Sequence, residues 1–113
     1  MMLLTKANQA ALPPIGSTSE QEDPIVQVKF FNPCGASTWF ATEFDGEDSF
    51  FGWCDLFGDE SCAELGYFSL SEMQSYRGTF GLGIERDLHF RPCPLSEAKA
   101  RLYGRRAPAA SVA

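Results

Sequence analysis

The side chains best suited to chemistry lie in the stretch GLGIERDLHF, which contains the only histidine of the sequence. Glu85, Asp87 and His89 occupy alternate positions there, so on a β-strand they share one face. Glu43 and Asp45 have the same spacing in an earlier segment that also has a strand pattern. If the two strands are neighbours, these carboxylates and the imidazole suit Mg²⁺ or Mn²⁺, and the metal would activate water for hydrolysis. One hypothesis is therefore a metal-dependent hydrolase.

The same side chains have a simpler explanation that involves no catalysis. Arginines occur nearby in the sequence, and an arginine that pairs with a carboxylate is common on a solvated sheet face. The sequence leaves both explanations open. His89 is a candidate ligand on one condition, which is that Glu43 and Asp45 lie beside it.

Acidic residues are concentrated before the middle of the chain. From Glu20 to Glu64 there are eleven carboxylates and one base, Lys29, whereas the whole chain has a net charge of -6. Such a segment repels phosphates and favours a protein partner with a basic surface. Aromatic residues lie among the acids, and exposed aromatic residues are typical of protein interfaces. The residues predicted to contact this partner are Glu43, Asp45, Glu47, Asp48, Trp53, Asp55, Asp59 and Glu60.

The last third of the chain has the opposite charge. After Glu64 there are seven bases and four acids, so a second alternative is nucleic-acid binding by this basic segment. The bases are Arg77, Arg86, Arg91, Lys99, Arg101, Arg105 and Arg106.

Hydrophobic periodicity and turn residues predict the elements that position these side chains. Alternating apolar residues predict four strands joined by short turns, with Asp-Gly at residues 45–46 as the hairpin signal. A helix capped by Thr5 precedes them, a helix from about Leu70 to Gly78 follows the capping-box spacing of SLSE, and a last helix is capped by Ser96. The residues expected to supply most of the core are Phe30, Phe40, Phe44, Phe51, Trp53, Tyr67 and Phe68.

These elements together predict an α+β fold. We expect a four- to five-stranded, mainly antiparallel sheet built as a meander, with short helices at the N-terminus, after the meander and at the C-terminus. The expected domain spans residues 1–104, and residues 105–113 are expected to form a flexible tail.

Cysteine usage and hydropathy bear on the compartment. The four cysteines form no C-x-x-C pair, which favours reduced thiols over a structural zinc site. No apolar run reaches the roughly 18 residues of a membrane span, and the first residues are too weakly apolar for the core of a signal peptide. We expect a cytoplasmic protein, and no cofactor unless the Mg²⁺ or Mn²⁺ site exists.

The strings DPIVQVKFFNP, TWFATEFD, ELGYFSLSEM and GLGIERDLHF, in this order, resemble a small bacterial family classified only as a domain of unknown function. The resemblance covers the chain from about Leu3 to Ala98 and implies an origin on plasmids, integrative elements or phages. The family has no established activity, but an origin of this kind agrees with the acidic charge of the chain. Our leading hypothesis is therefore a non-enzymatic accessory protein of a mobile genetic element that binds another protein. A specific version is an inhibitor that occupies the basic nucleic-acid groove of a host defence complex, such as a CRISPR or restriction complex.

Overall fold

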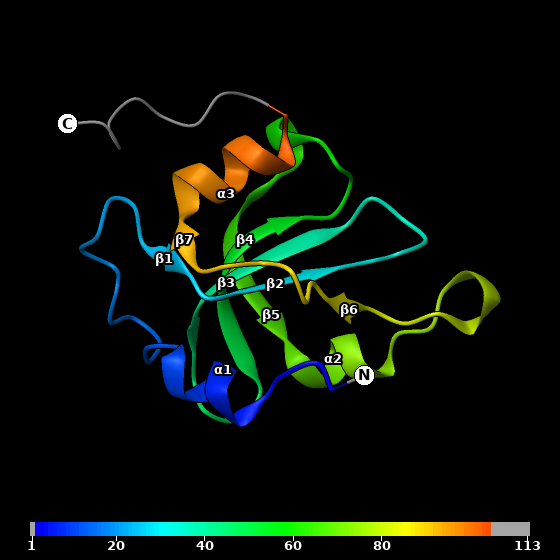
Figure 1. The fold of residues 1–113 in the computed structure, drawn as a ribbon, viewed down its shortest axis with the longest axis horizontal. Helices are drawn as coiled ribbons and strands as arrows, with labels where there is room; N and C mark the ends of the chain where they lie inside the picture. Colours follow the sequence, from blue (N-terminus) through cyan, green and yellow to red (C-terminus); the bar gives the residue numbers. More distant parts are fainter. Residues whose placement is uncertain (1, 105–113) are drawn as a thin grey trace.

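The computed structural model describes residues 2–104, so the predicted tail at 105–113 lies outside the described residues. Five strands form one antiparallel sheet in the order β5-β4-β3-β2-β6 (Figure 1). Their bounds are β2 Val28–Phe31, β3 Thr38–Phe44, β4 Ser49–Asp55, β5 Glu64–Ser69 and β6 Glu85–Arg86. Two short strands, β1 (Ile25–Val26) and β7 (Cys93–Pro94), pair separately. The predicted α+β fold with a mainly antiparallel sheet is confirmed.

Three short helices flank the sheet. The first, α1 (Lys6–Ala11), has the predicted Thr5 cap, with a reciprocal hydrogen bond to Asn8. The second, α2 (Leu70–Ser75), is capped by Ser69 but ends three residues before the predicted Gly78. The third, α3, spans Leu95–Leu102, and two single turns of 3-10 helix, η1 (Glu60–Cys62) and η2 (Thr79–Gly81), complete the set.

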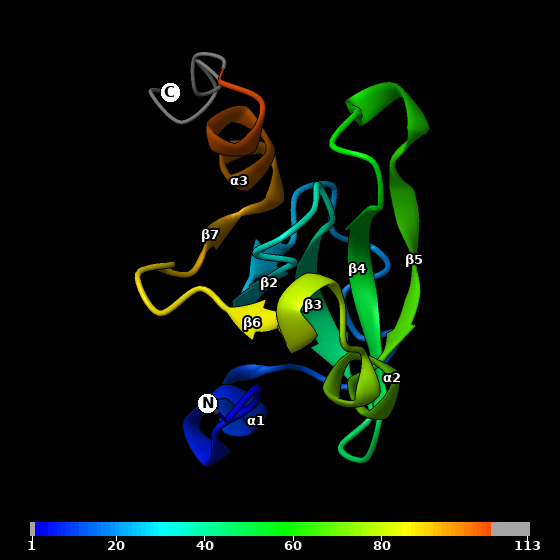
Figure 2. The same ribbon diagram turned by 90° about the vertical axis from the view of Figure 1, so that its right-hand side faces the viewer.

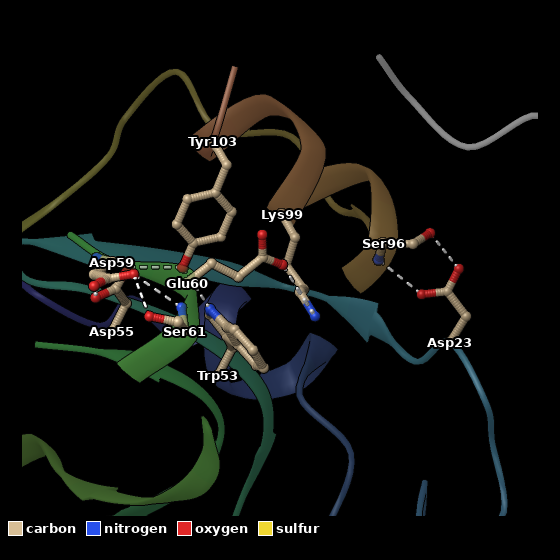
Figure 3. Close-up of polar contacts among 9 residues, drawn as sticks. All are labelled: Asp23, Trp53, Asp55, Asp59, Glu60, Ser61, Ser96, Lys99 and Tyr103. Atoms are coloured by element: carbon tan, nitrogen blue, oxygen red, sulfur yellow. Dashed lines mark hydrogen bonds and ion pairs between the residues drawn. The ribbon is translucent and has the colours of Figure 1, made fainter. Parts of the chain in front are cut away.

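The start of α3 differs from the prediction because a distant residue caps it. Ser96 lies inside the helix and is not its N-cap. Its backbone N–H and its hydroxyl both donate to the carboxylate of Asp23, at 2.8 and 2.6 Å (Figure 3). A cap supplied across the fold cannot be found from local sequence spacing.

The predicted strand through Glu85, Asp87 and His89 is largely absent. Strand β6 contains only Glu85 and Arg86. The chain turns at Asp87, whose side chain accepts a hydrogen bond from the backbone N–H of His89. A carboxylate that bonds to the backbone two residues ahead favours a turn over a continuing strand. The alternating pattern here was therefore a poor guide to strand length.

A bulge in β3 changes which residues share a face. The pairing of β3 with β4 shifts between Ala41 and Glu43. Before the shift, Trp39 and Ala41 lie on one face and Phe40 on the other, as alternation predicts. After it, Phe44 lies on the face of Ala41 and stacks on Phe50 at 4.5 Å. Strict alternation along TWFATEFD predicts that Phe44 shares a face with Phe40, and this prediction is wrong because the bulge adds one residue.

The sheet separates two hydrophobic cores. The α1–α2 core lies on one face and contains Leu3, Leu4, Leu12, Val28, Phe30, Ala41, Phe44, Phe50, Met73 and Ile84. The α3 core lies on the other face and contains Val26, Phe40, Trp53, Cys93, Leu95 and Ala98. Figure 2 shows α3 on one side of the sheet and α2 on the other, with β5 at the outer edge. Tyr67, which was expected in the core, is 68% exposed on this edge strand.

Candidate functional site

The five residues of the hypothetical metal site are not brought together. Strand β6 pairs with β2, and β2 lies between β6 and β3, so the condition for a site with Glu43 and Asp45 is not met. Asp87 pairs with Lys29 at 3.4 Å, and His89 is exposed. Across residues 2–104, no group of three or more histidine, cysteine or acidic residues is arranged to hold a metal ion.

Glu43 is an internal anchor for the loop after α1. It is only 3% exposed, and its carboxylate accepts hydrogen bonds from the backbone N–H groups of Gly16 (2.7 Å) and Thr18 (2.9 Å) and from the Thr18 hydroxyl. Burial raises the pKa of Glu43, but these three hydrogen bonds outweigh it and leave the pKa below its usual value. Glu43 therefore holds the chain around residues 16–18 against the sheet and is not available to a partner.

Three predicted contact aspartates close turns. Asp45 accepts from the backbone N–H groups of Glu47, Asp48 and Ser49, which closes the β3–β4 hairpin. Asp48 accepts from the Ser69 hydroxyl and the Ser71 N–H, which ties the hairpin to the start of α2. Asp59 accepts from Ser61 and caps η1. Hydrogen bonds to these carboxylates lower the pKa of each aspartate.

Asp55 and Trp53 belong to an internal network under α3 (Figure 3). Asp55 is 1% exposed and accepts from the backbone N–H groups of Phe57, Gly58 and Asp59. The Tyr103 hydroxyl donates to Asp55 at 2.7 Å and accepts from Trp53 Nε1 at 3.1 Å. Burial and then the bond to Asp55 raise the pKa of Tyr103 to about 12. This network fixes the end of α3 to β4.

Lys99 completes this closed region. Its Nζ lies 3.8 Å from the centre of the Trp53 ring and 3.8 Å from Glu60 Oε2. Glu43, Trp53 and Asp55 are thus buried, which corrects the expectation that they form a surface. Of the eight predicted contact residues, only Glu47 is exposed with a carboxylate that accepts no hydrogen bond from residues 2–104.

An open groove that the sequence did not predict lies on the opposite face of the sheet. Its volume is about 580 Å³. The floor is formed by Trp39 of β3, Cys54 of β4, and Gly66 and Phe68 of β5, and Trp39 and Phe68 also pack against the α1–α2 core. Tyr76, which follows α2, forms a wall and accepts a hydrogen bond from Asn32. The groove therefore has an aromatic interior supported by several elements.

The charged residues that line the groove are acidic. Glu64 and Glu72 line it, and no lysine or arginine does so among residues 2–104. Both glutamates are exposed, and no group in this part of the chain donates a hydrogen bond to either carboxylate. Burial and then the nearby charge of Glu64 raise the pKa of the Cys54 thiol to about 11, so it is protonated at neutral pH. The groove thus has an apolar floor and two carboxylates free to pair with a cation.

Gly66 was the sequence signal for this groove. Glycine inside a strand often marks a place where another group approaches closely, and ELGYFSL contains one in an otherwise favourable strand pattern. In the structure, a side chain added at Gly66 would meet nothing within 4 Å. Its cross-strand partner Gly52 has no free space beside it, because an added Cβ would lie 1.8 Å from the Phe40 carbonyl oxygen.

Comparison with protein families assigns the chain to a family. The sequence matches the family described as "Protein of unknown function (DUF2958)" over residues 2–105. The chain belongs to this family. The resemblance to a domain of unknown function is therefore confirmed. No curated protein and no solved structure matches the sequence, so function in this DUF2958 protein has to be argued from its own residues.

Several basic residues of the DUF2958 chain contact groups of the chain itself in the part that the structure describes. Lys99 contacts Glu60 and Trp53, and Arg101 pairs with Glu97 at 3.1 Å. Arg77 donates to the carbonyls of Gln74 and Tyr76, and Arg86 donates to the carbonyl of Met2. Arg105 and Arg106 lie outside the described residues. These contacts give the nucleic-acid alternative no specific support.

The four cysteines are free thiols. Among residues 2–104 of this DUF2958 protein, none of the helices has both the length and the apolar character needed to cross a bilayer.

Proposed function

We propose that this protein is a non-enzymatic accessory protein that binds a protein partner with a basic surface through the acidic, aromatic groove beside β5. The observation that carries the proposal is the composition of the groove, in which Trp39 and Phe68 are only partly buried and Glu64 and Glu72 are the charged residues. Partly exposed aromatic residues provide binding energy, and uncompensated charge selects a partner of opposite sign.

The groove replaces the hairpin tip as the preferred contact surface. In the hairpin, Asp45 and Asp48 are already bonded to the protein's own N–H and hydroxyl groups. A partner would have to compete with those bonds, which also hold the turn together. Within residues 2–104, Glu64 and Glu72 have no such bonds to lose. The acidic, aromatic character expected of the interface is kept, but its residues change.

A more specific form of the proposal concerns the partner. Charge complementarity fits a protein that holds nucleic acid in a basic groove, as defence complexes do. The family resemblance adds an origin on a mobile element and action in the bacterial cytoplasm. In this form the protein is an inhibitor of a CRISPR or restriction complex, and it would lower that complex's DNA binding in a filter-binding assay with purified components.

Two charge reversals of equal size test the location of the surface. Glu64→Lys changes the groove, and Glu47→Lys changes the hairpin tip, where the carboxylate is equally exposed. Tagged parent protein and both variants are used to capture proteins from a lysate of bacteria that carry the gene. We expect captured partners to bind Glu64→Lys about tenfold or more weakly and Glu47→Lys like the parent. Equal capture by all three proteins would contradict the proposal.

A further inference from the structure

Strand β5 is an edge strand whose outer side has no neighbouring strand among residues 2–104. It is six residues long, whereas the strand at the opposite edge, β6, has two. Exposed edges of this length present unpaired backbone groups that can pair with another chain. Proteins commonly shield such an edge with proline, lysine or a bulge, and β5 has none of these between Glu64 and Ser69.

The backbone hydrogen bonds between β4 and β5 decide which backbone groups face outward. The backbone N–H of Leu70 donates to the Asp48 carbonyl at 2.8 Å, one position beyond the Ser49–Ser69 pair of the β4–β5 ladder. Bonded and non-bonded pairs alternate in an antiparallel ladder. Counting back along the unbroken register, the N–H and C=O groups of Gly66 point toward β4, and those of Leu65 and Tyr67 point toward the outer edge.

We propose that the partner binds by adding an extended segment to the outer edge of β5. This inference rests on the proposed function and names the way in which the same site is used. The added strand would bond to the outward N–H and C=O groups of Leu65 and Tyr67, as in other cases of strand addition. Its side chains would then point alternately to the two faces of the enlarged sheet.

The two faces of β5 specify the residues of the occupant. On the groove face lie Glu64 and the open space over Gly66, with Glu72 beyond, so basic side chains fit there. On the other face lie the exposed side chains of Leu65 and Tyr67, so apolar side chains fit there. The occupant is therefore an extended segment in which lysine or arginine alternates with apolar, β-branched residues.

A second copy of this chain fits the edge less well than such a segment. Each copy has a net charge of -6, and pairing of two β5 strands would bring two copies of Glu64 and Glu72 to one interface. Like charges at an interface oppose association. Self-association is accordingly one of the outcomes that the experiment must detect.

Amide exchange measured by NMR tests the mode of binding, with the acetylated and amidated peptide Lys-Val-Lys-Val-Lys-Val as the probe. In the free protein, the amide of Gly66 should exchange slowly because it is bonded to β4, and those of Leu65 and Tyr67 should exchange fast. On addition of the peptide we expect protection to rise at Leu65 and Tyr67 and to stay unchanged at Gly66. The peptide Glu-Val-Glu-Val-Glu-Val, with equal strand propensity and opposite charge, should produce no protection.

Backbone and side-chain effects are separated by two variants at one position. Leu65→Pro removes the outward N–H without touching a bond to β4, and proline is tolerated on that side of an edge strand. Leu65→Ala removes only the side chain. We expect Leu65→Pro to bind the lysine peptide about tenfold more weakly than Leu65→Ala. If thermal unfolding shows that Leu65→Pro does not fold, the same comparison is made with Tyr67→Pro and Tyr67→Ala.

Each other outcome contradicts the inference in a distinct way. Peptide binding that Gly66→Leu abolishes, but that leaves Leu65 and Tyr67 unprotected, overturns strand addition and leaves the proposed function standing. Protection at both amides without peptide, together with a dimer in sedimentation, shows that a second copy is the occupant. No binding of the lysine peptide overturns the assigned occupant, while the proposed function is judged separately by Glu64→Lys and Glu47→Lys.

Discussion

The two faces of β4 and β5 use their acidic and aromatic residues in opposite ways. On the α3 face, the Tyr103 hydroxyl donates to Asp55 and accepts from Trp53, and Lys99 lies over the indole ring. On the groove face, Trp39 and Phe68 are only partly buried, and Glu64 accepts no hydrogen bond from residues 2–104. The same residue types stabilise the fold on one face and remain available for binding on the other.

Side-chain length explains much of this division. Aspartate is short, so its carboxylate reaches the backbone N–H groups two to four residues ahead and closes a turn. Asp45 and Asp55 both do so. Glutamate reaches past its own backbone, and Glu47, Glu64 and Glu72 remain exposed. Glu43 is an exception because another loop comes to it.

The largest effect is expected within the groove face, for two glycines that pair across β4 and β5 and therefore lie on the same face. Gly52→Ala places a Cβ 1.8 Å from the Phe40 carbonyl oxygen, and backbone atoms cannot move aside cheaply, so we expect a loss of about 4 kcal/mol or no folding. Gly66→Ala meets open space and should stabilise by about 0.5 kcal/mol, because alanine restricts the unfolded chain. Urea unfolding measures both. A similar loss for the two variants would contradict the open space over Gly66.

The next largest effect is expected at Asp55. Asp55→Ala leaves three backbone N–H groups and the Tyr103 hydroxyl without their acceptor. We therefore expect a loss of about 3 kcal/mol in the free energy of unfolding. Asp55→Asn keeps one acceptor oxygen for the turn and should lose about 1 kcal/mol. Urea unfolding measures both variants. If Asp55→Ala loses less unfolding free energy than Asp55→Asn, the role of Asp55 as an acceptor for these buried donors is contradicted.

Acidification should weaken the fold more gradually, through the buried carboxylates Glu43 and Asp55. The pKa values of Glu43 and Asp55 are lowered in the folded protein, because hydrogen bonds outweigh burial at each carboxylate. Groups of this kind stabilise above the unfolded pKa, and that stability is lost as the pH falls through the folded pKa. Unfolding free energy measured from pH 7 to pH 3 should therefore fall below about pH 4.5, and fall less steeply in Asp55→Asn. If the unfolding free energy of Asp55→Asn depends on pH as steeply as that of the parent protein, ionisation of Asp55 does not contribute to stability and this prediction is wrong.

The smallest effect on stability is expected at the groove acids. Glu64→Ala and Glu72→Ala remove exposed carboxylates without hydrogen-bond partners in the described part of the chain. Each should change the unfolding free energy by less than about 0.5 kcal/mol while weakening partner binding. A loss of stability comparable with that of Asp55→Ala would mean that these acids also serve the fold.

Much of the fold could be predicted from local sequence patterns. Alternation and Asp-Gly predicted β3, the hairpin and β4, and the caps at Thr5 and Ser69 were found from spacing alone. The bulge after Ala41 and the cap that Asp23 gives to α3 depend on contacts across the fold. Local patterns contain no record of such contacts, so these features were missed.

The candidate site could be predicted less well than the fold. The turn-closing role of Asp45 was visible in the string DGED, where a short acid precedes glycine, but net charge was given more weight. Strand alternation could not show that β5 lies at an edge, so Tyr67 was placed in the core although it is 68% exposed. The order of strands in a sheet depends on tertiary packing, and the groove exists only because of that order.

The affinity of the captured partner for Gly66→Leu tests the central claim most directly. This change fills the open space of the groove from a position where an added Cβ meets nothing, so the fold should be kept while the binding surface is lost. Measured by isothermal titration calorimetry, binding should fall about tenfold or more, whereas Glu47→Lys at the hairpin should bind like the parent. Unchanged affinity in a folded Gly66→Leu protein would contradict the groove as the binding surface.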